Sequence, residues 1–188
     1  FASGDGARFG SGPGRPLVIA QFEVFPKQIN GEPRGNYRFY AWTNGRTSGL
    51  DDQEQRHTGF GFSFDQRVGA EWNLFGRYGR RTSGEGSFSS GITLGFEHGG
   101  RVWGRSHDAV GLALGALKTD SDWRASTADR SLVGYAAHGT ERIAELYYRM
   151  KLNESLTLTP DFQLIDRAGG NSRATTVRLF GVRANLSF

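Results

Sequence analysis

Arginine, carboxylate and amide side chains, with a tryptophan among them, recur at alternate positions of several segments of this 188-residue chain. These polar groups can exchange hydrogen bonds with sugar hydroxyls, and an aromatic ring can stack on the C–H face of a sugar. Their mixed charge suits neutral polar solutes better than a strong filter for anions or cations. For any one of these residues, the alternative to contact with a solute is a structural role, in which paired Arg and Glu side chains brace the protein around them. The predicted solute contacts are Arg38, Trp42, Arg77, Glu97, Glu145, Arg149, Asp161, Gln163 and Arg183.

No residue pattern indicates catalysis or a bound metal. The chain has no cysteine, which excludes disulfides and a thiolate metal site. The pairs Asp51–Asp52 and Asp120/Asp122 lack the EF-hand pattern of a calcium site. The histidines fall in predicted loops or at strand ends without metal-ligand spacing: His57, His98, His107 and His138. We therefore predict a protein that is not an enzyme, with no catalytic residue, no metal and no cofactor.

Composition narrows the class of protein further. The chain is rich in glycine (28 residues) and in aromatic residues (13%), and chains rich in aromatics are seldom disordered. Its net charge of +4 comes from arginines interleaved with Asp and Glu, whereas a nucleic-acid binder clusters its cations. No run of about 18 apolar residues predicts a transmembrane helix. The opening residues, FASGDGARFGSGPGRP, do not read as a signal peptide, and any such peptide is expected to have been removed.

Alternation with a period of two residues, which is typical of β-strands, organises almost the whole chain. We predict an all-β protein, with a Gly-rich N-terminal segment over residues 1–16 and antiparallel transmembrane β-barrel strands over residues 17–188. The predicted strands are Leu17–Phe25, Asn36–Thr43, His57–Arg67, Trp72–Arg80, Ser87–His98, Asp108–Lys118, Thr140–Lys151, Leu156–Ile165 and Thr175–Phe188.

The length and the faces of these strands favour a membrane sheet. Strands of soluble proteins peak near ~5–6 residues, whereas a tilted membrane-spanning strand needs ~9–11. In the segment GFGFSFD, Phe60, Phe62 and Phe64 share one face, and small or polar residues occupy the other. Few apolar residues remain to cover these rings. We expect the rings to face lipid and the opposite face to line a water-filled lumen.

Two alternatives compete with this reading. A soluble sandwich or barrel would alternate in the same way, with the phenylalanines packed inward, but its strands would be shorter. The turns VGAE and LNES are tight, whereas residues 44–56 and 119–139 form long links, an asymmetry typical of membrane barrels. The segment TERIAELYYRMKL also has the pattern of an amphipathic helix, but its Tyr147–Tyr148 pair and its short link to the next strand favour a strand.

Aromatic residues near strand ends, Trp72, Tyr78 and Tyr148, are predicted to form an interfacial girdle.

Five segments in chain order resemble a known family, the carbohydrate-selective outer-membrane porins of the OprB type. They are GNYRFYAWTNG at positions 35–45, FSFDQRV followed by WNLFGRYG at 62–79, GGRVWGRSHDAVGLALG at 99–115, ERIAELYYRMKLNESLTLTPDFQLI at 141–165, and the closing GVRANLSF. The last of the long segments is the closest match. The final Phe188 resembles the terminal aromatic residue by which outer-membrane barrels are recognised for assembly. The resemblance spans residues 17–188.

The resemblance implies a function as well as a fold. It implies passive diffusion of small polar solutes, and of sugars in particular, across a bacterial outer membrane. It also implies contact with outer-membrane lipid and assembly by the barrel-assembly machinery through Phe188, and it leaves a homo-oligomer open. The scattered charge separately predicts no nucleic-acid partner. Family members are about twice as long and form sixteen-stranded barrels, so we expect this chain to be the C-terminal part of such a barrel. The alternatives are a soluble carbohydrate-binding β-domain, or an outer-membrane barrel with a structural or anchoring role.

Overall fold

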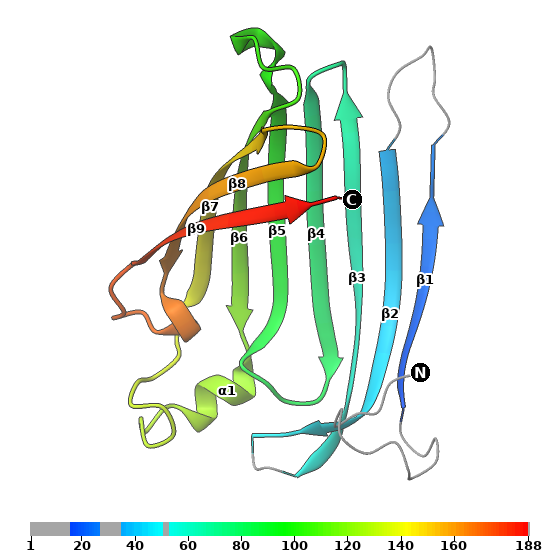
Figure 1. Ribbon diagram of the computed structural model, residues 1–188. Helices are drawn as coiled ribbons and strands as arrows, with labels where there is room; N and C mark the ends of the chain where they lie inside the picture. Colours follow the sequence, from blue (N-terminus) through cyan, green and yellow to red (C-terminus); the bar gives the residue numbers. More distant parts are fainter. Residues whose placement is uncertain (1–15, 27–34, 51–52, 188) are drawn as a thin grey trace.

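The computed structural model describes residues 16–26, 35–50 and 53–187, and these residues form one antiparallel sheet (Figure 1). Each strand pairs with the next in the sequence, in the order β1 to β9. The strands are β1 (Leu17–Val24), β2 (Gly35–Ser48), β3 (Glu54–Val68), β4 (Trp72–Ser83), β5 (Phe88–Gly99), β6 (Ala109–Thr119), β7 (Thr140–Lys151), β8 (Leu156–Asp166) and β9 (Val177–Leu186). All nine predicted strands are confirmed. Residues 1–15 and Phe188 lie outside the described residues, so the separate N-terminal segment stays a prediction.

The boundaries of β2 and β3 are the largest departure from the predicted strands. β2 continues past Asn44–Gly45 to Ser48, and β3 already begins at Glu54, although the sequence predicted a long polar loop between these strands. A register shift between Asn44 and Thr47 takes up the irregularity, which is how a β-bulge lets a ladder continue past a turn signal. The backbone N–H of Gly49 donates to the Gln53 carbonyl oxygen at 2.8 Å and closes a short link instead.

The segment between β6 and β7 contains the short helix α1 (Ser121–Ser126), which the sequence analysis missed. Asp120 caps this helix, because its side chain accepts a hydrogen bond from the Asp122 backbone N–H at 2.9 Å. The carboxylate considered for calcium therefore serves as a helix cap, and Asp51 and Asp52 lie outside the described residues. The neighbouring segment with a helical pattern is β7, which pairs along its length with β6 and for most of its length with β8.

The connections at the two ends of the sheet are less unequal than predicted. At one end, which we call the short-turn end, lie the tight links β3–β4 and β7–β8, but also the nine-residue link β5–β6, which contains the 3-10 turn η1 (Gly100–Trp103). At the other end, the long-loop end, lie the extended link with α1 and the link β8–β9 with η2 (Ala168–Gly170). The links β2–β3 and β4–β5, also at this end, are short.

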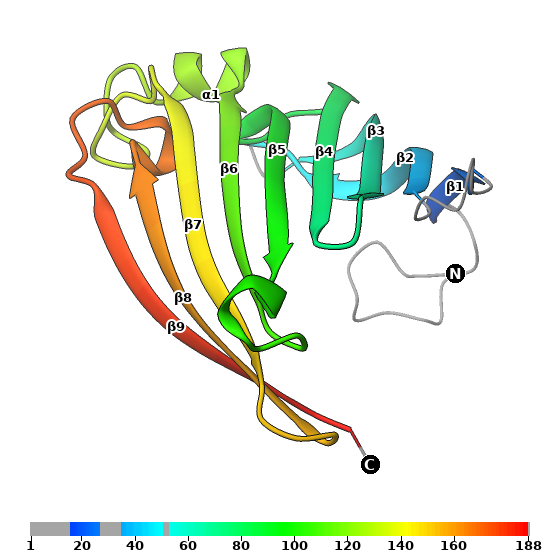
Figure 2. The ribbon, with the colours of Figure 1, turned by 90° about the horizontal axis from the view of Figure 1, so that it is seen from above.

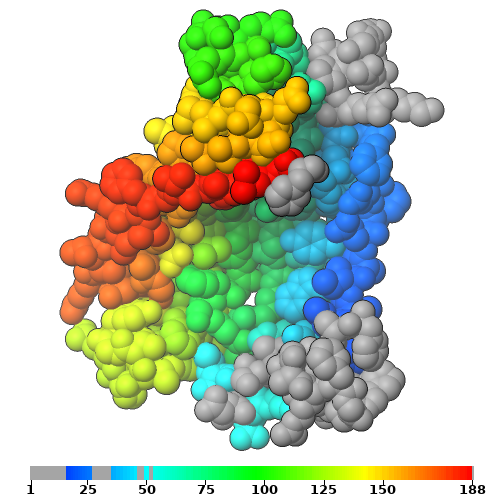
Figure 3. Space-filling model, in the orientation of Figure 1, coloured from blue at the N-terminus to red at the C-terminus, as the bar shows by residue number. Residues whose placement is uncertain are grey.

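The sheet bends into an arc with a concave and a convex face (Figure 2). Seen from the front, β9 arches before the middle strands, and the concave face is visible between β9 and β1 (Figure 3). Within the described chain, β1 pairs only with β2 and β9 only with β8, so the arc stays open.

Large apolar side chains cover the convex face and remain exposed. Phe39, Phe62 and Tyr78 stand opposite one another on successive strands, and the rings of Phe39 and Phe62 lie 4.8 Å apart. Phe60 is 45% exposed and Leu114 is 56% exposed, although both lie in the middle of the sheet. Among the described residues, only Ala109 and Ala137 are buried hydrophobic residues. Such a face has no protein interior over it, which excludes the two-layer sandwich for this part of the chain.

Aromatic residues gather on the convex face at the short-turn end. The ring of Trp72 lies 5.3 Å from that of Phe96 and 4.5 Å from that of His98, and Trp103 continues the row to Tyr148. The Trp103 indole N–H donates to the Tyr148 hydroxyl at 3.1 Å. Tyr78 lies in the middle of β4 rather than at its end, because this strand continues to Ser83. No helix of the described chain is both long and apolar enough to span a membrane.

Candidate functional site on the concave face

The concave face carries the polar half of the alternating pattern. One row across neighbouring strands reads Arg67, Asn73, Glu97, Gly111, Tyr147 and Asp161. Because successive residues of a strand point to opposite faces, the register that exposes the apolar side chains outside collects these polar groups inside.

An ion pair at the centre of this row joins β5 and β7 across the intervening β6. The Arg149 guanidinium donates to Glu97 Oε1 at 2.7 Å, and Arg149 Nε lies 3.4 Å from Oε2. The Tyr147 hydroxyl donates to the same carboxylate at 3.2 Å. Gly111 of β6 stands between Glu97 and Tyr147, and its lack of a side chain leaves room for the Tyr147 ring, whose hydroxyl thereby reaches the carboxylate. The carboxylate therefore has a two-pronged partner and a fixed orientation.

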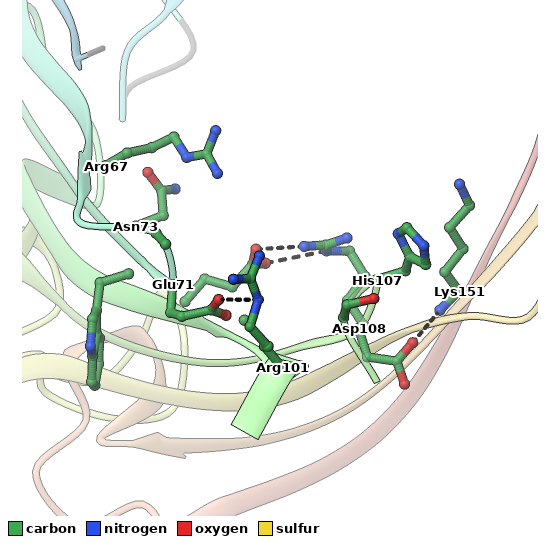
Figure 4. Close-up of a pocket in the computed structure, with 13 residues that line it drawn as sticks. Arg67, Glu71, Asn73, Arg101, His107, Asp108 and Lys151 are labelled. Carbon is green, nitrogen blue, oxygen red and sulfur yellow. Dashed lines mark hydrogen bonds and ion pairs between the residues drawn. The ribbon is translucent and has the colours of Figure 1, made fainter. Parts of the chain in front are cut away.

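A pocket of about 580 Å³ opens beside this pair, at the short-turn end (Figure 4). Its wall is mostly polar, and the Arg101 guanidinium pairs with Glu71 there at 3.1 Å. Arg67 and Asn73 lie on one side of the pocket, and His107 and Lys151 on the other (Figure 4). Both signs of charge line the pocket, so it can hydrogen-bond a polar solute through donors and acceptors alike.

Asp108 anchors the rim of this pocket. Asp108 is only 3% exposed, and its carboxylate accepts hydrogen bonds from Arg105, from the Tyr148 hydroxyl at 2.7 Å and from the Lys151 backbone N–H at 3.0 Å. The Arg105 bond is the main cause that lowers the pKa of Asp108 to about 2, against the opposing effect of burial, and the bonds from Tyr148 and Lys151 act in the same direction. The link β5–β6 is thus tied to the start of β6 and the end of β7 by a carboxylate that stays charged.

A second charged cluster lies on the first three strands. The Arg38 guanidinium contacts Asp65 at 2.8 Å and Glu23 at 3.2 Å, so one cation on β2 bridges carboxylates on β3 and β1. At the long-loop end, Arg81 pairs with Asp120 at 2.7 Å, and both side chains are nearly buried. This last pair joins β4 to the cap of α1, and we assign it to holding the loops in place.

All nine predicted contact residues lie on the concave face by register, but the structure brings only some of them together. Glu97 meets Arg149, and Gln163 donates to Asp161 at 3.0 Å beside the position of Glu145. The others stand apart from this group: Arg38 with its two carboxylates, Trp42 over Gly59, Arg77 exposed on β4, and Arg183 opposite Thr159 on β9. The role of all nine residues as solute contacts stays a prediction.

The sequence analysis did not place several residues of the pocket in the site. Glu71, Arg101 and Lys151 belong to turns or strand ends, where alternation carries no information about the face. Asp108 was counted as the first residue of a strand, whereas β6 begins at Ala109. Its position directly before an apolar alternating run is a signal for an anchoring carboxylate. The neighbouring sequence does not show that Tyr148 and Lys151, about 40 residues further on, are its partners.

One continuous antiparallel sheet, apolar outside and charged within, defines a segment of β-barrel wall. The structure of Pseudomonas putida OprB at high pH shares this fold with a TM-score of 0.78 at 18% identity, over 98% of this chain and 52% of that one. Porin AaxA of Chlamydia felis (strain Fe/C-56) is 23% identical over 184 residues, which are 91% of this chain and 39% of that protein.

The family profile of the carbohydrate-selective porins, OprB family, matches residues 2–188. The chain therefore belongs to the OprB family, and the resemblance carried by its five sequence segments is confirmed. It spans about half the length of the solved relative and less than half of the curated one.

Proposed function

We propose that this chain forms part of the wall of a bacterial outer-membrane porin through which small polar solutes, saccharides among them, diffuse passively. The observation that carries the proposal is the opposition of its two faces. Exposed apolar side chains cover the convex face, and ion pairs and amides occupy the concave face of the same strands. A sheet with hydrocarbon on one side and water on the other requires this division. No step of such a function needs turnover or a cofactor.

Further strands are proposed to close the wall between β9 and β1. Each of these edges has a neighbour on one side only within the described chain, and unpaired strand edges are not stable in lipid. The matched relatives are about twice as long or longer, which supports a barrel of about sixteen strands to which this chain contributes the C-terminal part. Assembly through Phe188, which lies outside the described residues, and association of several barrels are part of the same proposal.

The mixed charge of the concave face supports a preference for neutral polar solutes. Glu97 and Arg149 neutralise each other, and Arg38 is shared between two carboxylates. Solutes that offer several hydroxyls can replace their bound water with such donors and acceptors. Sugars fit this requirement better than simple ions of either sign.

Reconstitution of the full-length protein in planar lipid bilayers tests the proposal. We expect stepwise conductance with weak ion selectivity, and swelling of protein-containing liposomes in an isotonic glucose solution. A barrel with a structural or anchoring role would insert without conductance, and a soluble sugar-binding domain would remain monodisperse without detergent. Either result would contradict a porin.

A further inference from the structure

Four aromatic rings on the concave face each lie over a glycine of the neighbouring strand. In every pair the ring and the glycine stand directly opposite in the register: Trp42 and Gly59, Tyr40 and Gly61, Phe75 and Gly95, Tyr147 and Gly111. Only Trp42 belongs to the predicted contact residues. The recurrence of this arrangement on three strand pairs, β2–β3, β4–β5 and β6–β7, indicates a common purpose.

The glycines hold these rings flat against the sheet. A Cβ atom added to Gly59 would lie 2.7 Å from two carbons of Trp42, and a Cβ added to Gly61, Gly95 or Gly111 would overlap the ring above it. Side chains of a strand otherwise stand roughly perpendicular to the sheet. A ring that lies down on a glycine instead has one face against the backbone and turns the other toward the concavity. All four rings are half-buried, as this arrangement requires.

Three glycines lie in one row beside Tyr40, and the middle one, Gly79, is open: the Tyr40 ring covers Gly61, and the Leu117 side chain reaches over Gly91. Gly61, Gly79 and Gly91 are successive partners on β3, β4 and β5. The Tyr40 hydroxyl lies 3.7 Å from the Cβ position of Gly79, so the Tyr40 side chain extends across β3 and ends beside this glycine of β4. Arg77 stands in the adjacent row on β4, where it is exposed. Gly79 therefore leaves room for a flat solute beside the Tyr40 ring, with the Arg77 guanidinium as a donor in the adjacent row.

We propose that these four rings are stacking platforms for pyranose rings and make the pore favour ring-closed sugars over acyclic polyols of similar size. The inference rests on the proposed function and specifies its substrate class. A pyranose presents a rigid C–H face that matches the face of an aromatic ring. An acyclic polyol has the same hydroxyls but no rigid face, and it loses conformational freedom when it is flattened on the wall.

The competing role of such a ring is to fill the gap over a glycine and stabilise the sheet. The convex face offers a matched control for that role. There the ring of Phe64 covers Gly76 of β4, and a Cβ added to Gly76 would overlap this ring. Phe64 contributes the same packing to the wall but faces away from the concavity, so it cannot meet a solute.

The test compares the permeation of glucose and sorbitol in liposome swelling with the full-length protein. We expect the unaltered protein to pass glucose faster than sorbitol, and the doubly substituted Tyr40→Leu, Trp42→Leu protein to lose about three- to tenfold of this ratio. The control Phe64→Leu should keep the ratio of the unaltered protein. Tyr40→Phe should also keep it, because the ring remains, whereas Gly61→Ala should lower it by lifting the ring from the sheet.

The outcomes distinguish a failure of the stacking platforms from a failure of the proposed porin function. A glucose-to-sorbitol ratio near one in an unaltered protein that conducts ions would overturn the stacking platforms and leave the porin intact. An equal fall of the ratio in Phe64→Leu and in the double variant would also overturn them, because both would then act through the wall. An unaltered protein without any conductance would overturn the proposed function and this inference together.

Discussion

The two faces of β6 differ in the size and polarity of their side chains, although they share one backbone. Leu112 and Leu114 project to the convex face, where Leu114 faces Leu94 and Ala144 and is 56% exposed. Gly111 and Ala113 belong to the concave face, where Ala113 stands beside Glu145 and Gly111 makes room for the Tyr147 ring, whose hydroxyl donates to Glu97. The outer face has large side chains and few polar contacts. The inner face has small residues between charged ones.

This difference shows what each face must do. The convex face needs only to be apolar at every position, so its side chains can vary without a specific partner. The concave face needs room as well as polarity, because Glu97 and Tyr147 belong to strands that are not neighbours and meet across a glycine. Small residues on β6 are therefore as much a part of the site as its charges.

Arginine substitutions at adjacent positions of β6 test the difference most strongly. Leu114→Arg places a charge in the middle of the convex face and should lower the free energy of unfolding by about 2–4 kcal/mol, because a cation near the bilayer midplane is poorly solvated. Ala113→Arg places the same side chain opposite Glu145 and should cost less than about 1 kcal/mol. Urea unfolding in lipid vesicles measures both. Equal losses in the two variants would show that both faces contact the same solvent.

Neutralising one member of the central ion pair separates solute selectivity from stability. Glu97→Gln leaves the Arg149 guanidinium without its carboxylate, so the reversal potential in a KCl gradient should shift toward anions, and Arg149→Gln should shift it toward cations. Both side chains are partly exposed, so the change in stability should stay below about 1 kcal/mol. Glu154→Gln, in the exposed turn between β7 and β8, is the control and should leave the reversal potential unchanged.

Acid titration gives the smallest effect, confined to the rim. The pKa of Asp108 is lowered to about 2, compared with about 3.9 for an unpaired aspartate, so its stabilising contribution is complete above about pH 4 and is lost as the pH falls through about 2. The Trp103 indole N–H donates to the Tyr148 hydroxyl, which in turn donates to Asp108. The NMR resonance of the Trp103 indole N–H should therefore shift when Asp108 is protonated. Asp108→Asn should abolish this transition. A midpoint near pH 4 in the unaltered protein would contradict the proposed anchoring by Arg105.

The strands were largely predictable because alternation is a local property. Thr140–Lys151 was predicted to the residue, since apolar and polar positions alternate along it and both flanks are clear. The extension of β2 was not predictable in the same way, because Asn44–Gly45 signals a turn locally and only its pairing with β3 carries the strand through a bulge. The short helix α1 depends on a cap and on the Arg81–Asp120 pair, which joins positions 39 residues apart.

The sequence by itself determined that this chain is a set of two-faced strands, since hydrophobicity with a period of two is written residue by residue. It also determined which residue types occupy the inner face, from Arg38 on β2 to Arg183 on β9. Only the tertiary structure decided which of them meet. The contact of Glu97 with Arg149, and the placement of Tyr40 on Gly61, depend on the register between strands and on the curvature of the sheet. Register and curvature arise from many distant pairings at once, so no single stretch of residues contains them.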